Sequence, residues 1–351
     1  MSSKPLRHEE HGTKILGVEW APINISLARR LQTASVLFFV CVFVLMPVWS
    51  VWLPIYLFFY TKYWWIVVLY FVWMWYDLDT PKLGSRPIHW IRNHAVWRYL
   101  KDYFPIELHK TAELDPDKNY VMGIHPHGVL SIGAFTNFCT EATGFSRQFP
   151  GITPHLMTLV GQFWFPVRRE LPMLLGAVEV SRESINYLMG LPTTGHACVI
   201  VVGGAHECME AHPGHYHLNL TNRKGFIKMA LVQGADLVPM FSFGEVDLFD
   251  QVGNDEKSKV RKVQTFFKKL IGFPPVLFYG RGIFNYTFGF LPYRRPVNTV
   301  VGKPIPVTKT ASPTRDQIND LHADYVRNLK ELFEANKDKF GLTDNDKLII
   351  Y

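Results

Sequence analysis

The sequence predicts an α/β protein in which helices flank a sheet, preceded by a membrane-embedded helical hairpin. A long, nearly uncharged apolar stretch over 34–76 indicates the hairpin. Past Pro105, short apolar runs that end in glycine or proline alternate with amphipathic stretches, which is typical of an α/β domain. The chain has 351 residues, of which 48% are hydrophobic and 19% charged, so it can bury a large core and is neither disordered nor a coiled coil.

The apolar stretch consists of two runs. The first, 34–60, has no charged residue, and the second covers 63–76. A bilayer core takes about 20 helical residues, so the first run spans it, whereas the second has to tilt or be re-entrant. We expect Pro47 and Pro54 to kink the first run and Lys62 to mark the turn between the two.

Basic residues flank the hairpin on both sides, which predicts that both flanks, and with them both termini, are cytosolic. The expected division is a cytosolic segment over 1–33, a transmembrane or re-entrant hairpin over 34–76, and a membrane-associated domain over 77–351. Nine of the ten tryptophans lie between Trp20 and Trp97. The hairpin is therefore either a mere anchor or an anchor that also helps lipid substrates to enter the site. The flanking basic residues are Arg29, Arg30, Lys82, Arg86, Arg92, Arg98 and Lys101.

Within the domain, four strands and three helices stand out. Expected strands cover 119–124, 197–202, 237–243 and 299–301, and expected helices cover 129–138 and 224–233, the latter stopped by Gly234, with a last helix that begins at Ser312 and Pro313. The four cysteines, Cys41, Cys139, Cys198 and Cys208, are widely spaced and lack a paired arrangement, so we expect reduced thiols in a cytosol-facing protein.

The strongest local motif is Gly123-Ile124-His125-Pro126-His127-Gly128, between an expected strand and an expected helix. A neutral histidine there can take a proton from an alcohol near neutral pH, and the amides that open the helix could stabilise an oxyanion. The two glycines are expected to let a substrate approach closely. The alternative is that both histidines are simply hydrogen-bonded in a tight turn.

A histidine base needs an orienting carboxylate, and the best candidate follows another apolar strand. Gly203 and Gly204 end that strand and Glu207 comes three residues later. In a parallel sheet both motifs open at the carboxyl edge, so we expect Glu207 to be the partner of His127. The two glycines alone are also compatible with an ordinary tight turn.

A third cluster is cationic. Arg223, Lys224 and Gly225 start an expected helix and could bind phosphate groups, although an ordinary solvated helix start has the same pattern. The net charge of +7, from 37 basic and 30 acidic residues, suits an anionic membrane, a phosphate-bearing substrate or nucleic acid, and charge does not choose among them.

Other chemistries have less support. No Gly-x-Ser-x-Gly elbow and no phosphate-binding Gly-x-x-x-x-Gly-Lys-Ser/Thr loop occurs. A metal hydrolase is the rival, because His-x-His at a strand end also begins metal sites and His212, His215 and His217 could add ligands. The acidic residue that usually follows is missing.

The ordered motifs resemble those of one family, the type-2 diacylglycerol acyltransferases and monoacylglycerol acyltransferases of the endoplasmic reticulum. The resemblance covers nearly everything from Val18 to about Leu342 and implies a glycerolipid-acyltransferase-like sheet flanked by helices. The matching blocks are 18–22, 29–33, 102–106, 125–128, 149–156, 202–204 with Glu207, 223–245 and 280–305.

The resemblance implies direct acyl transfer from fatty acyl-CoA to diacylglycerol or monoacylglycerol, with the histidine tetrad at the catalytic centre. His127 is then the base, Glu207 its partner, and His125 a support for the turn or a substrate contact. The wider glycerolipid acyltransferase class has an aspartate after the histidine, where this chain has Leu130 and Ile132.

The resemblance also implies the surroundings of the reaction. Acyl-CoA is a co-substrate, no metal or other cofactor and no nucleic acid is expected, and the protein is placed in the endoplasmic reticulum membrane with lipid droplets as a second location. Acceptor preference stays open, as does the oligomeric state, with a homo-oligomer as one alternative. The implied substrate-binding residues are Gly128, Tyr103, Phe104, Pro105, Pro154, His155, Gly203, Gly204, Arg223, Lys224 and Gly225, with Arg294 and Arg295 as further candidates for the CoA phosphates.

Overall fold

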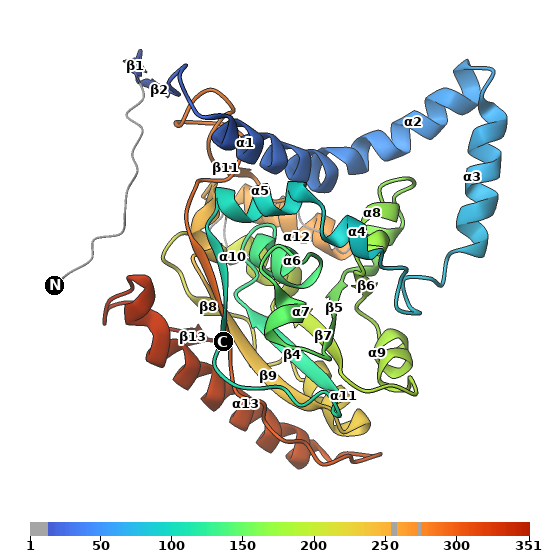
Figure 1. Cartoon of the computed structure of the whole chain (residues 1–351), viewed down its shortest axis with the longest axis vertical. Coiled ribbons are helices and arrows are strands. Elements are labelled where there is room, and N and C mark those ends of the chain that lie inside the picture. Colours follow the sequence, from blue (N-terminus) through green and yellow to red (C-terminus); the bar gives the residue numbers. More distant parts are fainter. Residues whose placement is uncertain (1–12, 254–257, 272–274) are drawn as a thin grey trace.

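A mixed seven-stranded sheet forms the centre of the computed structural model, which describes residues 13–253, 258–271 and 275–351 (Figure 1). The strand order is β3-β12-β9-β4-β7-β5-β6. β9, β4, β7, β5 and β6 are parallel, β12 is antiparallel to β9, and β3 is parallel to β12. The strands are β3 Ile106–Lys110, β4 Tyr120–His125, β5 Thr153–Thr158, β6 Val178–Glu179, β7 His196–Val201, β9 Asp236–Phe243 and β12 Val297–Val301.

The four expected strands are confirmed as β4, β7, β9 and β12, within one or two residues at each end. Three strands of this sheet were not expected. β6 has only two residues, and β3 and β5 mix apolar with polar side chains, so that none of the three gives the continuous apolar run of a central strand. The antiparallel direction of β12 also has no signal in the local pattern.

Helices cover both faces of the sheet, and each face has its own core. On one face α1, α5 and α6 pack with Met122, Val199 and Met240, and on the other α9, α11 and α13 pack with Val121 and Ile200. These are alternate residues of the same strands, as the period of a strand requires. The helices are α1 Leu27–Val40, α2 Met46–Tyr60, α3 Trp64–Tyr76, α4 His89–Arg92, α5 Ala95–Tyr103, α6 Ile132–Phe138, α7 Phe145–Gln148, α8 Glu170–Leu174, α9 Arg182–Met189, α10 Gly204–Glu210, α11 Gly225–Gln233, α12 Lys259–Ile271 and α13 Arg315–Asn336.

Two expected helix starts are wrong. The helix expected from Val129 begins only at Ile132, because Ser131 adopts a left-handed backbone with a φ of 50°. The last helix begins at Arg315, since Thr314 caps it and forms a reciprocal capping box with Gln317. Helix α11 agrees with the expectation and ends at Gly234, which has a φ of 69°.

The N-terminal apolar region forms one long bent helix and a shorter one. The first runs over Leu27–Tyr60 as α1, the π-helical turn Cys41–Leu45 and α2, and its 34 residues are long and apolar enough to cross a membrane. Figure 1 shows the change of direction between α1 and α2, next to the π-helical turn that precedes Pro47. The turn expected at Lys62 is confirmed between α2 and α3.

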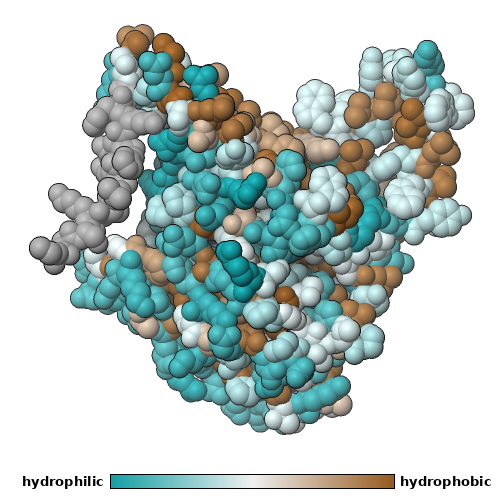
Figure 2. Space-filling model, in the orientation of Figure 1, coloured by the Kyte–Doolittle hydropathy of each residue, from teal (hydrophilic) through white to brown (hydrophobic). Residues whose placement is uncertain are grey.

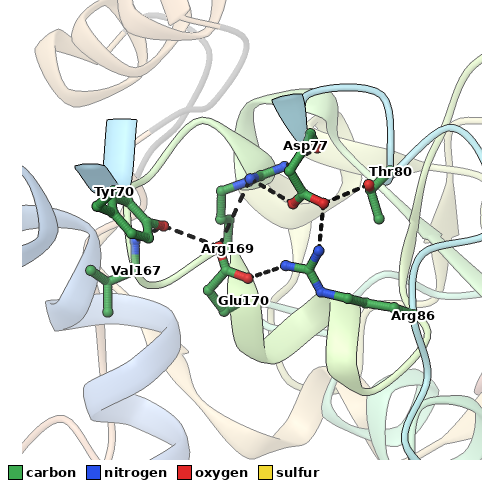
Figure 3. Close-up of polar contacts among 7 residues, drawn as sticks. All are labelled: Tyr70, Asp77, Thr80, Arg86, Val167, Arg169 and Glu170. Atoms are coloured by element: carbon green, nitrogen blue, oxygen red, sulfur yellow. Dashed lines mark hydrogen bonds and ion pairs between the residues drawn. The ribbon is translucent and has the colours of Figure 1, made fainter. Parts of the chain in front are cut away.

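A buried polar network holds the end of α3 to the domain (Figure 3). The Arg169 guanidinium donates to the Asp77 carboxylate at 2.9 Å and to its backbone carbonyl at 2.8 Å. Arg86 bridges Asp77 and Glu170. Within α3, the Tyr70 hydroxyl donates to Glu170 at 3.0 Å and accepts from the Val167 amide at 2.7 Å.

Short elements complete the fold. The smaller sheets pair β1 Thr13–Ile15 with β2 Val18–Trp20, β10 Asp250–Gln251 with β11 Phe278–Tyr279, and β8 His217–Leu218 with β13 Ile349–Ile350. All four cysteines are free thiols.

Candidate active site

The histidine motif leaves the carboxyl end of β4, in the middle of the sheet. β7 is a parallel neighbour of β4, so α10, which follows β7, starts at the same edge. α1 lies above this edge, because Phe39 of α1 packs edge-on against Phe135 of α6 with ring centroids 5.1 Å apart. α1 therefore packs next to α6, the helix that follows the motif, while His127 itself is half-buried.

The His127 ring has a defined orientation. Its Nδ1 lies 3.0 Å from the Gly128 carbonyl and 3.2 Å from the Ser131 hydroxyl, which itself donates to the His127 carbonyl at 2.8 Å. A carbonyl only accepts, so the neutral ring holds its proton on Nδ1 and leaves the Nε2 lone pair as the basic site. Burial lowers the pKa of His127 below the ordinary value, which keeps the ring neutral at pH 7.

Glu207 lies beside His127, but it contacts the backbone and not the ring. Its carboxylate accepts from the His127 amide at 3.0 Å and from the Asn219 amide at 2.9 Å. Burial raises the pKa of Glu207 to about 7, and those two hydrogen bonds and the charge of Arg223 partly oppose the shift. Glu207 thus fixes the position of the turn, and the carbonyl of Gly128 takes the ring-orienting place that we expected for the carboxylate.

Glu245, which follows β9, holds the other side of the turn. Its fully buried carboxylate accepts from the amides of Ile132 and Gly133 at 2.7 and 2.8 Å. Burial raises the pKa of Glu245 to about 7, against these two hydrogen bonds. The expectation that the first amides of this helix stabilise an oxyanion is therefore wrong for Ile132 and Gly133, and other donors have to meet the oxyanion.

His125 is completely buried and faces Tyr325 of α13. Its Nε2 is 3.1 Å from the Tyr325 hydroxyl of α13, which also bonds the Gly123 carbonyl at 3.1 Å. Burial lowers the pKa of His125 to about 3. A Cβ atom at Gly123 would lie 2.0 Å from that hydroxyl, and one at Gly128 would lie 2.8 Å from Glu245. These two glycines therefore make room for protein side chains. The expectation that they let a substrate approach closely is wrong.

Arg294 joins α1 to the domain at the same edge. Its guanidinium donates to Gln32 at 2.6 Å and to Thr33 at 3.1 Å and stacks 4.0 Å above the Tyr103 ring. Tyr103 in turn donates to the Pro292 carbonyl at 2.7 Å. These contacts give Arg294 and Tyr103 a structural role, since their polar groups already have partners within the protein. Phe104 and Pro105, which follow Tyr103, lie in the same turn before β3, and Arg295 donates to the Asp247 carbonyl at 2.9 Å.

The cationic cluster lies at the start of α11. Lys224 donates to Asn319 of α13 at 2.7 Å, whereas Arg223 is exposed and close enough to Glu207 to lower its pKa. A Cβ atom at Gly225 would meet no heavy atom within 4 Å, and the same holds for Gly204 on α10. Arg223 is thus the member of the cluster that is best placed to meet a phosphate.

Pro154 and His155 lie at the far edge of the sheet. Pro154 is level with Tyr120 at the start of β4, because both pair with Ala197. His125, five residues further along β4, is about 16 Å away along the strand at 3.3 Å per residue. His155 is buried with its Nε2 3.2 Å from His196, so the structure does not bring this pair to the histidine turn.

The later histidines do not complete a metal site within the described part of the chain. The rings of His212, His215 and His217 are neighbours, with centroid separations of 5.8 and 5.4 Å. No group of three or more histidine, cysteine, aspartate or glutamate side chains among the described residues could hold a metal ion.

Four residues of the site were missed in the sequence, namely Ser131, Asn219, Glu245 and Tyr325. Only Glu245 had a usable signal, since a carboxylate that follows an expected strand of a parallel sheet lies at the carboxyl edge. The others come from a turn, from the loop after β8 and from a helix far along the chain.

Known proteins match the chain over most of its length. A family model described as diacylglycerol acyltransferase matches residues 56–351. The chain is 49% identical over 332 residues to "2-acylglycerol O-acyltransferase 1" of Bos taurus, which covers 95% of this chain and 99% of that protein. It is 48% identical over 326 residues to "Diacylglycerol O-acyltransferase 2" of Danio rerio, with 93% and 90% covered. Among solved structures, the 1-acyl-sn-glycerophosphate acyltransferase PlsC of Thermotoga maritima matches with 12% identity and a TM-score of 0.39, over 87% of this chain and 97% of that one.

The chain belongs to the diacylglycerol acyltransferase family, and it is an acyltransferase. The resemblance that the sequence motifs predicted is thereby confirmed. Relatives with two different acceptors in their names match it almost equally well, so identity does not separate the two acceptors.

Proposed function

We propose that the protein transfers a fatty acyl group from acyl-CoA to the free hydroxyl of diacylglycerol, which makes triacylglycerol, with 2-acylglycerol as the alternative acceptor. The observation that carries the proposal is the His127 ring, neutral and oriented through Nδ1 at the carboxyl edge of the sheet. An oriented neutral imidazole is the group that a direct transfer to an alcohol needs.

The proposed reaction has one proton transfer and one acyl transfer. Nε2 of His127 takes the proton of the acceptor hydroxyl as its oxygen attacks the thioester carbonyl. The tetrahedral intermediate then breaks the carbon–sulfur bond and releases the CoA thiolate, which the imidazolium can protonate. The step requires no acyl-enzyme, metal or cofactor, but it requires that water is kept from the thioester.

The proposed surroundings follow from the N-terminal helices. We place the hairpin, expected over 34–76, in the endoplasmic reticulum membrane with α2 and α3 as its membrane part, because Val36 and Phe39 of α1 belong to the core of the domain. Residues 1–33 and 77–351 are placed on the cytosolic side, and the sheet of the domain is proposed to be of the glycerolipid acyltransferase type. α1 begins at Leu27 and packs on the domain, so the acyltransferase unit includes the first part of the long helix. Arg223 on the exposed side is the proposed contact for a CoA phosphate. Lipid droplets remain a second proposed location and a homo-oligomer a proposed assembly.

The test is acyl transfer from oleoyl-CoA by membranes that contain the wild-type protein, with diacylglycerol and 2-acylglycerol offered in parallel. His127→Ala is compared at equal abundance. His109→Ala is the matched control, because His109 lies on edge strand β3, away from the histidine turn, and bonds Asn298. The proposal expects product with the wild type and the control but not with His127→Ala, and the preferred acceptor gives the specificity. If neither acceptor is acylated, or if His127→Ala is as active as the wild type, the proposal fails.

A further inference from the structure

Large apolar side chains gather on the surface next to the first turn of α1. We call this the aromatic patch and define it as Leu16, Trp20, Ile23, Phe284, Phe288 and Phe290. Leu16 is 99% exposed, Ile23 88%, Phe284 72% and Phe290 70%. Exposed apolar groups that lie together, and not singly, usually mark a surface that binds a partner or a membrane.

The patch is built on an ordered backbone. β2 continues beside the loop over 280–291, since Ala21 donates to the Phe284 carbonyl and Tyr286 donates to the Glu19 carbonyl, both at 2.8 Å. The buried Asn285 side chain accepts from the amides of Thr287 and Phe288 at 3.1 and 2.9 Å. The phenylalanines are therefore held outward by a folded support.

Within the loop, a buried cation adds to that support. The Arg281 guanidinium lies 4.5 Å from the Tyr286 ring centroid, and the Arg281 backbone exchanges hydrogen bonds with Leu291 at 2.7 and 2.9 Å. The two ends of the loop are thus closed on one another, and its tip presents Ile283, Phe284 and Phe288. Because the loop is already ordered, binding of its apolar tip to a partner would cost little further conformational entropy.

The position of the patch points to lipid. β2 leads through Ile23 directly into α1, and α1 continues into the long apolar helix. In Figure 1, β1, β2 and α1 lie along the same upper side of the domain as the hairpin, whereas α13 lies on the opposite side. Figure 2 shows hydrophobic residues along this upper side, at the corner of β1 and β2 and again on the hairpin.

The charges beside the patch also suit a membrane surface. Lys14 and Arg30 are exposed next to it, and Arg30 donates to the Ile23 carbonyl at 3.1 Å, which places its cation at the border of the patch. Basic side chains around an apolar surface attract anionic lipid headgroups.

We propose that the aromatic patch inserts into the headgroup and acyl boundary of the bilayer that holds the hairpin, as a second membrane contact. The inference rests on the membrane location given under Proposed function. The two contacts lie at opposite ends of the long helix, and α1 between them covers the sheet edge with His127. The edge is then held towards the membrane, from which a lipid acceptor has to come.

The test measures lipid contact residue by residue in the full-length protein in proteoliposomes. In a Cys41→Ser background, Phe284→Cys, Trp52→Cys on α2 and Lys330→Cys on α13 each carry an environment-sensitive fluorophore. The vesicles contain phosphatidylcholine and phosphatidylserine, and a fraction of the lipid carries a nitroxide quencher either near the headgroup or deep in the acyl chain. The background protein without an added cysteine measures labelling of the three buried thiols.

The proposal expects the Phe284→Cys label to lose fluorescence, more with the shallow than with the deep nitroxide, while the Lys330→Cys label is unchanged. Quenching at Trp52→Cys without quenching at Phe284→Cys overturns the patch contact but leaves the membrane hairpin standing. No quenching at either position shows that the membrane location itself fails. Energy transfer between Phe284→Cys labels on different copies, without quenching by lipid, would assign the patch to self-association and overturn the proposal.

Discussion

The histidine turn and the N-terminal hairpin are held in opposite ways. In the turn, the amides of His127, Ile132 and Gly133 each have a buried carboxylate as acceptor. In the hairpin, Ser50 is the buried side chain of α2 and Val67 that of α3. One region is fixed by hydrogen bonds to buried carboxylates, and the other exposes apolar side chains and is attached to the domain at its two ends.

The difference shows how the fold divides its tasks. Two carboxylates from separate strands, Glu207 after β7 and Glu245 after β9, position one turn, and hydrogen bonds to buried groups are costly to leave unmade. In the proposed membrane location the hairpin needs no such accuracy, because burial of apolar surface requires no directional contacts. Changes to the turn should therefore affect activity and stability strongly, and changes to the hairpin attachment only weakly.

Glu245→Ala is the largest expected disruption of the turn. It leaves two buried amide donors without an acceptor, which costs about 2–6 kcal/mol at roughly 1–3 kcal/mol for each donor. We expect a large loss of transferase activity and a lower melting temperature in detergent. Glu245→Gln keeps one acceptor and should recover part of both.

Thr314→Ala is the matched control, since Thr314 also caps a helix but at the exposed start of α13. Its expected cost is about 1 kcal/mol, with activity retained. If Glu245→Ala is as stable and as active as Thr314→Ala, the carboxylate does not hold the turn.

Gly203→Ala tests the second carboxylate. A Cβ atom at Gly203 would lie 1.7 Å from the Glu207 carboxyl carbon, so Glu207 has to move away from the His127 amide. Overpacking of this kind costs about 1–3 kcal/mol, and we expect lower transferase activity at equal abundance. Gly253→Ala, where a Cβ atom meets nothing within 4 Å, should have no such effect. Equal activity of the two variants would contradict a positioning role for Glu207.

These two regions also differ in what the sequence could predict. The helical hairpin could be predicted from composition alone, because a long uncharged run interrupted by the single charge of Lys62 indicates two apolar helices with a turn between them. The strand before His125 and the proximity of Glu207 follow from the carboxyl-edge rule for parallel strands. The contact of Glu207 with a backbone amide could not be predicted, since it depends on the path of the loop through Asn219. The left-handed Ser131 and the arrival of Tyr325 from α13 are likewise tertiary effects without a local pattern.

Tyr70→Phe weakens the attachment of the hairpin. The variant loses the hydrogen bonds of the hydroxyl to Glu170 and to the Val167 amide, while Asp77, Arg86 and Arg169 still hold the end of α3. We expect a loss of about 1 kcal/mol and nearly full activity. Limited proteolysis between α3 and α4 should become faster, and unchanged proteolysis would show that the hydroxyl does not contribute to the attachment.

The pH dependence of the activity distinguishes titration of His127 from titration of Glu207 or Glu245. It is the smallest perturbation, because it needs no substitution. Burial lowers the pKa of His127, so the acid limb of kcat/KM should lie below pH 6.5, the ordinary histidine value. The same shift makes the fold less stable as the pH falls below 6.5, because the unfolded chain binds the proton more readily. An acid limb near pH 7 would instead assign the titration to Glu207 or Glu245, whose pKa values are raised to about 7.

The most direct measurement compares His127→Ala with His125→Ala for acyl transfer and melting temperature in the same preparation. His127→Ala keeps the backbone amide that donates to Glu207, whereas His125→Ala removes the buried partner of Tyr325. We expect His127→Ala to lose about 10²–10⁴-fold in rate at nearly unchanged melting temperature, and His125→Ala to lose stability. A His127→Ala protein that transfers oleate at the wild-type rate would contradict the assignment of His127 as the base.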